Sequence, residues 1–246
     1  MSNVQSVERA IAILKCFENG GQLGLTEISE MVGINKSTAY NLMHTMVENG
    51  ILEQSKNFKK YSLGMDLFRI ASCYKRNFRE ICLPHMKELS MDIGESVNLV
   101  CRSGDSAIYI EIIESPYSKR ASISIGQKYP LHCSACGKVL LANLEPELRD
   151  ALLGDLDLKP FTANTLTDPG QLKEQLEIVR AQGYAVDLEE MDYGLICIAV
   201  PIFNPSRVPA AALSISGTAA HMDAGTQQRA VALLNSHANR IMGKML

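Results

Sequence analysis

The chain has 246 residues, of which 46% are hydrophobic and 21% are charged, and its formal net charge at pH 7 is −3. This composition is ordinary for a globular protein and excludes disordered and fibrous chains. The longest nearly unbroken apolar run, Leu195 to Phe203, is far shorter than the roughly 20 residues of a membrane-spanning helix, so no membrane partner is expected.

The N-terminus and the cysteines predict the compartment. Residues 1–9 show no basic region followed by an apolar one, so no secretory signal is expected. Seven cysteines, an odd number, then indicate free thiols in a reducing cytoplasm.

Residues 1–63 are predicted to form a small helical module that ends in a β-hairpin. Ser6, Thr26 and Asn35 are expected to cap its three helices. The third helix has an apolar stripe at helical spacing that can face a core. The stripe consists of Ala39, Leu42, Met43, Met46 and Val47. Two strands, 51–54 and 60–63, are expected to flank a basic turn.

Residues 64–79 are predicted to form a linker helix, and Leu83-Pro84 is expected to break the chain before a further helix that ends near Ile93. Residues 80–246 mix strand-like and helical patterns, which indicates a larger α+β module. Its predicted strands are 97–101, 107–113, 120–125, 184–188, 196–203 and 210–216, and its predicted helices are 135–143, 169–182 and 224–242.

The third helix also has a polar face, which predicts contact with DNA. A helix that enters the major groove presents hydrogen-bond donors there, and the short turn before it matches helix-turn-helix spacing. A solvated helix surface is the alternative, and the charges of residues 1–63 balance to zero, but most of their basic residues cluster at this helix and the basic turn. The candidate DNA contacts are Thr26, Lys36, Ser37, Thr38, Tyr40, Asn41, His44, Lys56, Lys59 and Lys60.

Several stretches resemble the IclR family of bacterial transcription regulators. They are Gln5-Ser-Val-Glu-Arg-Ala-Ile-Ala-Ile-Leu14, Leu25-Thr-Glu-Ile-Ser29, Lys36-Ser-Thr-Ala-Tyr40, Pro130-Leu-His-Cys-Ser-Ala-Cys-Gly-Lys-Val-Leu-Leu141, and the spaced set Gly183, Asp187, Glu190, Cys197-Ile-Ala199 and Ile202-Phe203-Asn204. The resemblance implies an α+β protein with a winged helix-turn-helix (1–63), a linker helix (64–79) and a GAF-like effector domain with an antiparallel sheet (80–246). It also implies an effector-responsive regulator of a catabolic operon without enzymatic activity, which binds its operator as a homodimer or homotetramer. Many members of the family repress, and some activate.

The resemblance further implies an effector pocket, whose candidate residues are Ala135, Cys136, Asp187, Cys197, Ser214 and Ser216. The residue chemistry favours a small oxo- or hydroxy-carboxylic acid. Backbone N–H groups at the start of the helix from Ala135 attract a carboxylate. Ser214 and Ser216 share one face of a predicted strand, and Asp187 can accept from a hydroxyl. No cofactor is expected.

An alternative function uses thiols. Cys133 and Cys136 form a Cys-x-x-Cys at a predicted helix start, where a thiol pKa falls, so a redox sensor or a thiol oxidoreductase is conceivable. A metal site would need further ligands, such as His132 and Cys197. The remaining ionisable groups are expected to be structural or solvated. They are the isolated His85, His221 and His237 and the acidic run Glu189, Glu190 and Asp192.

Overall fold

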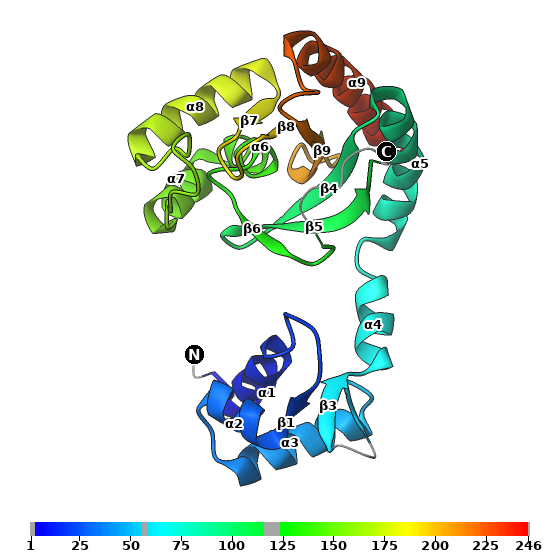
Figure 1. Ribbon diagram of the computed structural model, residues 1–246, viewed down its shortest axis with the longest axis vertical. Helices are drawn as coiled ribbons and strands as arrows, with labels where there is room; N and C mark the ends of the chain where they lie inside the picture. Colours follow the sequence, from blue (N-terminus) through cyan, green and yellow to red (C-terminus); the bar gives the residue numbers. More distant parts are fainter. Residues whose placement is uncertain (1–2, 56–58, 116–123, 246) are drawn as a thin grey trace. The chain divides into compact units, whose positions relative to one another are not determined.

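The computed structural model describes residues 3–55, 59–115 and 124–245. Contacts divide the chain into two compact units, Met1–Arg76 and Asn77–Leu246 (Figure 1). The first unit is mainly helical with a small sheet, and the second combines a larger sheet with helices. The predicted α+β class is therefore confirmed. In the described ranges, no helix has the length and apolar character that a membrane crossing requires.

The first unit consists of a helical cluster and a three-stranded antiparallel sheet of order β1-β3-β2. Its elements are α1 (Gln5–Lys15), β1 (Leu23–Gly24), α2 (Leu25–Val32), α3 (Lys36–Glu48), β2 (Leu52–Gln54), β3 (Lys60–Leu63) and α4 (Met65–Ser72). From the predicted stripe of α3, Ala39, Met43 and Met46 are buried in the core of this unit. This packing leaves the opposite, polar face of α3 outside.

The helix caps of the first unit agree only in part with expectation. Asn35 caps α3 as predicted, because its side-chain oxygen accepts from the N–H of Thr38 at 2.8 Å. The caps expected at Ser6 and Thr26 are wrong, since the capping positions of α1 and α2 lie two residues earlier, at Val4 and Gly24. At α2 the Glu27 carboxylate accepts from the N–H of Gly24 at 2.6 Å, so an acidic side chain supplies the cap.

The connection after the hairpin is not one helix over 64–79, as predicted, but two. Helix α4 ends at Ser72 and α5 (Arg76–Ile93) follows a short turn in which Lys75 adopts a positive φ of 47°. The break expected at Leu83-Pro84 is also wrong, because Pro84 lies inside α5. Cys82 and Met86, on either side of the proline, are fully buried, so packing holds the helix together despite the N–H that proline lacks.

The second unit is built on a six-stranded antiparallel sheet of order β6-β5-β4-β9-β8-β7. Its strands are β4 (Ser96–Ser103), β5 (Ser106–Ile113), β6 (Lys128–Pro130), β7 (Ala185–Leu188), β8 (Leu195–Phe203) and β9 (Pro209–Thr218). Its further helices are α6 (Ala135–Ala142), α7 (Pro146–Asp155), α8 (Pro169–Gln182) and α9 (Ala224–Gly243). Most of the strand predicted at 120–125 lies outside the described residues, and Ser124 and Ile125 form no strand.

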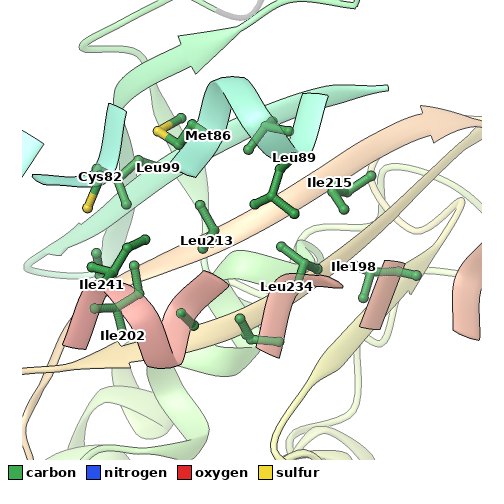
Figure 2. Close-up of a cluster of buried hydrophobic side chains, with 14 of the residues drawn as sticks. Cys82, Met86, Leu89, Leu99, Ile198, Ile202, Leu213, Ile215, Leu234 and Ile241 are labelled. Carbon is green, nitrogen blue, oxygen red and sulfur yellow. The ribbon is translucent and has the colours of Figure 1, made fainter. Parts of the chain in front are cut away.

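Helices cover both faces of this sheet, and the alternation along the strands decides which residue meets which helix. On one face, Ile198 and Ile202 pack with α5 and α9, as Figure 2 shows. On the other face, Ala199 packs with α6 and α8. Small residues on this second face leave room between the sheet and α6, and the candidate pocket lies there.

Candidate DNA-binding face and effector pocket

The polar face of α3 is open to solvent. Lys36, Ser37, Asn41 and His44 are exposed, and Tyr40 is 48% exposed. The side chains of this face mostly interact with each other. The Tyr40 and His44 rings lie 5.8 Å apart, and His44 lies 3.5 Å from the Glu48 carboxylate. The helix therefore presents hydrogen-bond donors and a half-exposed aromatic ring to solvent.

The remaining DNA candidates lie nearby in sequence or in the hairpin. Thr26 is exposed in the first turn of α2, while Thr38 is half-buried and its backbone N–H is bound to Asn35. Lys59 and Lys60 are exposed at the start of β3, and Lys59 has a positive φ of 50°. Lys56 lies outside the described residues. The exposure of these side chains is compatible with DNA contact, which stays a prediction for each of them.

In the second unit, a cavity of about 220 Å³ lies between the sheet and the start of α6. The structure brings all six candidate effector residues to its wall. The lining consists of Tyr109, Tyr129, Ser134, Ala135, Cys136, Asp187, Met191, Asp192, Leu195, Cys197, Ser214 and Ser216. A volume below the 300–1,000 Å³ of sites for drug-sized ligands suits a small metabolite.

Strand register explains why residues far apart in the chain meet here. Asp187 on β7 pairs with Cys197 on β8, which pairs with Ser216 on β9. Ser214 lies two residues before Ser216 and so points to the same face. Together these residues form a polar patch on a sheet face that is otherwise apolar.

Asn98 organises the two serines, and no pattern in the sequence indicated it. Its side-chain amide donates to Ser214 Oγ at 3.3 Å and to Ser216 Oγ at 3.0 Å, and it is buried on the neighbouring strand β4. Because each serine oxygen already accepts, its O–H remains as a donor. Each serine is also hydrogen-bonded to a thiol of the cavity wall, Ser214 to Cys136 and Ser216 to Cys197, and a thiol is a weak acceptor.

The start of α6 supplies further donors. Ser134 Oγ accepts from the N–H of Gly137 at 3.1 Å, which caps the third position of the helix. No described group accepts from the N–H of Ala135 or of Cys136, although both residues are buried at the cavity wall. Gly137 makes this geometry possible, since a Cβ there would lie 2.2 Å from the carbonyl oxygen of Leu131.

Asp187 is the titratable group of the cavity. Its side chain accepts from the N–H of Glu190 at 2.7 Å, and the residue is 2% exposed. Burial raises the pKa of Asp187 to about 7, because a carboxylate loses hydration there. Near neutral pH this carboxyl can therefore carry a proton and donate to a ligand.

A buried ion pair lies behind the cavity, where sequence reasoning expected a solvated acidic loop. Lys138 of α6 donates to the Glu190 carboxylate and, at 2.6 Å, to the carbonyl of Val186. Both side chains are buried, and Asp192 lines the cavity. The expectation of a solvated run at 189–192 is therefore wrong for Glu190, which ties β7 to α6.

The thiol alternative finds no support in the geometry. All seven cysteines are free, as expected. Desolvation raises the pKa of Cys133 and of Cys136 to about 12, so the low pKa expected at a helix start is wrong. Among the described residues, His132 and Cys197 do not join these thiols in a cluster that could hold a metal ion.

The cavity also contains residues that no sequence pattern indicated. Tyr109 and Tyr129, from β5 and β6, bring two rings whose centroids lie 5.0 Å apart, and Met191 and Leu195 add apolar surface. Their positions depend on the pairing of β5 with β6, a strand too short to be predicted. They add aromatic and apolar surface to the cavity wall.

Comparisons with known proteins agree over nearly the whole chain. Residues 6–56 match the IclR helix-turn-helix domain, and residues 70–242 match the family described as bacterial transcriptional regulator IclR C-terminal. The HTH-type transcriptional regulator KdgR of Escherichia coli is 36% identical over 245 residues, covering 99% of this chain and 93% of that protein. The transcriptional repressor IclR of the same species is 36% identical over 219 residues, covering 87% and 80%.

Solved structures show the same architecture. The Thermotoga maritima IclR structure has a TM-score of 0.77 and 32% identity, and it covers 99% of both chains. An IclR homologue from Microbacterium hydrocarbonoxydans, solved with 4-hydroxybenzoate, has a TM-score of 0.88 and 25% identity, and it covers 98% of this chain and 99% of that one. The chain therefore belongs to the IclR family of DNA-binding transcriptional regulators, which are not enzymes.

Proposed function

We propose that this protein represses a catabolic operon and senses a small carboxylic acid, preferably an oxo or hydroxy acid. The observation that carries the proposal is a set of four donors at the cavity wall, of which two have no acceptor among the described residues and two bind only weakly accepting thiols. Two are backbone N–H groups at the positive end of α6 and two are the hydroxyls of Ser214 and Ser216. Protonated Asp187 adds a fifth donor, and an anionic ligand supplies acceptors for the N–H groups and stronger acceptors than thiols for the hydroxyls.

The cavity shape also supports a ligand with one anionic end and a short body. Tyr109, Tyr129 and Leu195 lie at the wall together with the donors, so an apolar or aromatic body has a surface to pack on. The relative from Microbacterium hydrocarbonoxydans was solved with 4-hydroxybenzoate, an aromatic hydroxy acid. The same class of acid is our candidate here, while the thiol alternative is set aside.

For DNA binding, we propose that α3 enters the major groove of an operator. Tyr40 and Asn41 meet base edges, and Lys36 and Ser37 meet phosphates near the helix start. Lys59 and Lys60 contact the backbone from the hairpin, together with Lys56, which lies outside the described residues. A DNA regulator of this kind works in the cytoplasm, where bacterial operators are.

We further propose that the protein acts as a homodimer or homotetramer whose copies read repeated half-sites. In the first unit, an apolar groove is lined by residues of α4 and the end of β3, among them Met65 and Phe68. Both side chains are 69% exposed, which is unusual for large apolar groups unless a partner covers them. Sedimentation of the Phe68→Ser variant tests this: a shift to smaller species is expected, and unchanged mass would exclude α4 as the interface.

A thermal-shift series tests the effector class. We expect short 2-oxo acids, 2-hydroxy acids or hydroxybenzoates to raise the Tm of the protein, because a ligand that binds only the folded state stabilises it. The corresponding amides serve as neutral controls and are expected to have no effect. The Ser214→Ala, Ser216→Ala double variant loses the shift, whereas Ser206→Ala, at an exposed turn, keeps it. Equal shifts with acids and amides would contradict an anion site.

A further inference from the structure

On the opposite face of the sheet, two histidines that are 152 residues apart in the chain meet. His85 lies on α5 and is 1% exposed, and His237 lies on α9 and is 4% exposed. Their Nδ1 atoms are 3.3 Å apart and their ring centroids 5.4 Å apart. The sequence predicted that they are isolated, which is wrong, while the structural role expected of them stays a prediction. Fully apolar residues would fill this helix contact at lower cost, so the pair needs an explanation.

The spacing of the two nitrogens is that of ligands on one tetrahedral ion. With Zn–N distances of about 2.0–2.1 Å, two nitrogens of a tetrahedral zinc site lie roughly 3.3–3.4 Å apart. A hydrogen bond between two neutral imidazoles also fits 3.3 Å, at the long end of the usual range. Both arrangements leave His85 Nε2 buried without a partner among the described residues, so it is a third donor atom, that of Glu88, that favours an ion.

The histidines are in the form that binds metals. Burial lowers the pKa of His85 and of His237, with the nearby Arg240 contributing at both and Lys244 at His85. Both rings are therefore neutral at pH 7, and a nitrogen lone pair on each is available. The cationic side chains oppose a metal ion, and Glu88 and Asp92 favour one.

Glu88 completes the set of donor atoms. It lies three residues after His85 on α5, so the two side chains share one helix face. Its Oε2 is 3.9 Å from His237 Nδ1, and the donor atoms of all three residues lie within 4.8 Å of one another. The Glu88 carboxylate now binds Arg240 at 3.1 Å, and both side chains are about half-exposed. Rotation of this half-exposed carboxylate away from Arg240 brings it to an ion held by the histidines.

We propose that His85, Glu88 and His237 form a binding site for one divalent transition-metal ion of the zinc class, with water as a fourth ligand. Two imidazoles and a carboxylate are ligands that Zn²⁺ and Co²⁺ accept in tetrahedral geometry. The ion joins α5 to α9 across the surface of the hydrophobic core in Figure 2. This site is separate from the effector pocket and does not depend on the proposed effector.

Cobalt binding to the full-length chain tests the site directly. After treatment with a chelator, Co²⁺ is titrated into the protein, and the visible absorption of tetrahedral cobalt is followed. We expect one ion per chain, displacement by Zn²⁺ and no thiolate-to-cobalt charge-transfer band. Loss of a ligand should weaken binding by about 100-fold or more, since loss of a mere outer-shell partner costs roughly 10–100-fold. His237→Gln and Glu88→Gln test this, and the half-exposed Glu88 can be changed without disturbing the core.

Two control variants separate a built site from adventitious binding. Arg240→Gln frees the Glu88 carboxylate and removes a cation, so its affinity for Co²⁺ should equal or exceed that of the parent. His221→Gln removes an exposed histidine elsewhere and should change nothing. Absence of binding, a thiolate band, or equal affinity in Glu88→Gln and the parent protein would overturn the proposal and leave a hydrogen-bonded histidine pair only.

Discussion

Replacement of Asp187 by asparagine tests the electrostatics of the cavity. The pKa of this carboxyl is about 7, against about 3.9 for aspartate in an unfolded chain. Each pKa unit corresponds to 1.36 kcal/mol, so the ionised carboxylate costs the folded state up to about 4 kcal/mol. Asparagine keeps an oxygen that can accept from the N–H of Glu190, but it carries no charge. We therefore expect Asp187→Asn to stabilise the protein at neutral and alkaline pH.

The stability effect of Asp187 depends on pH in a direction that follows from its raised pKa. Below about pH 4 the carboxyl is protonated in both states and costs nothing. Between about pH 4 and 7 the unfolded chain releases the proton while the folded state keeps it, so parent stability falls as pH rises. Above about pH 7 the full cost is present. The stability difference between Asp187→Asn and the parent should thus grow across this window and then level off.

Urea unfolding followed by circular dichroism at pH 5, 6, 7 and 8 measures this difference for the second unit. Asp192→Asn is the matched control, because this residue also lines the cavity but is exposed. Its stability relative to the parent should vary little with pH. A difference between Asp187→Asn and the parent that is constant over the series, or that shrinks as pH rises, would refute the assigned cause of the pKa shift.

Three further predictions concern other parts of the molecule. In an anisotropy assay, Tyr40→Ala should weaken operator binding by about 1–3 kcal/mol and leave binding to nonspecific DNA unaffected. Lys59→Ala should weaken binding to both DNAs and lower by about 1 the slope of log binding constant against log salt concentration. The reverse pattern would contradict the proposed docking. Lys138→Met should lower the free energy of unfolding in urea by roughly 3–5 kcal/mol, because it leaves the buried Glu190 carboxylate unpaired. A loss under about 1 kcal/mol would count against a stabilising Lys138–Glu190 ion pair. At pH 8, iodoacetamide should alkylate the exposed Cys73 long before Cys136, as mass spectrometry can follow, and preferential labelling of Cys136 would revive the thiol alternative.

Helix bounds could be predicted from the sequence where the residues that begin and end the helix lie next to it in the chain. Helix α8 has the bounds predicted for it, 169–182, and the structure shows local signals at both ends: Asp168 caps it, Pro169 begins it and Gly183, with a positive φ of 80°, ends it. The break at Pro84 was wrong because the burial of Met86 and its neighbours outweighs a local helix breaker. Tertiary packing, which a single sequence does not display, decided that element.

The cavity residues could likewise be predicted only in part from the sequence. Its six candidate residues came from a family resemblance and all reach the wall, but Asn98 was missed. Its role depends on the register of β4 against β9, which pairs it with Ser214. The meeting of His85 and His237 likewise depends on two helices packing on one sheet face, and no spacing along the chain could indicate it.

The central claim is that one unit binds operator DNA and that a carboxylic acid in the cavity of the other unit changes this binding. Fluorescence anisotropy of DNA from upstream of the protein's own gene, titrated with protein and then with the acid that raises the Tm most, measures this coupling directly. We predict that the acid shifts the Kd for DNA at least fivefold in the parent protein and not in the Ser214→Ala, Ser216→Ala variant. An equal shift in both proteins, or a Kd that no Tm-raising acid changes, would contradict the account.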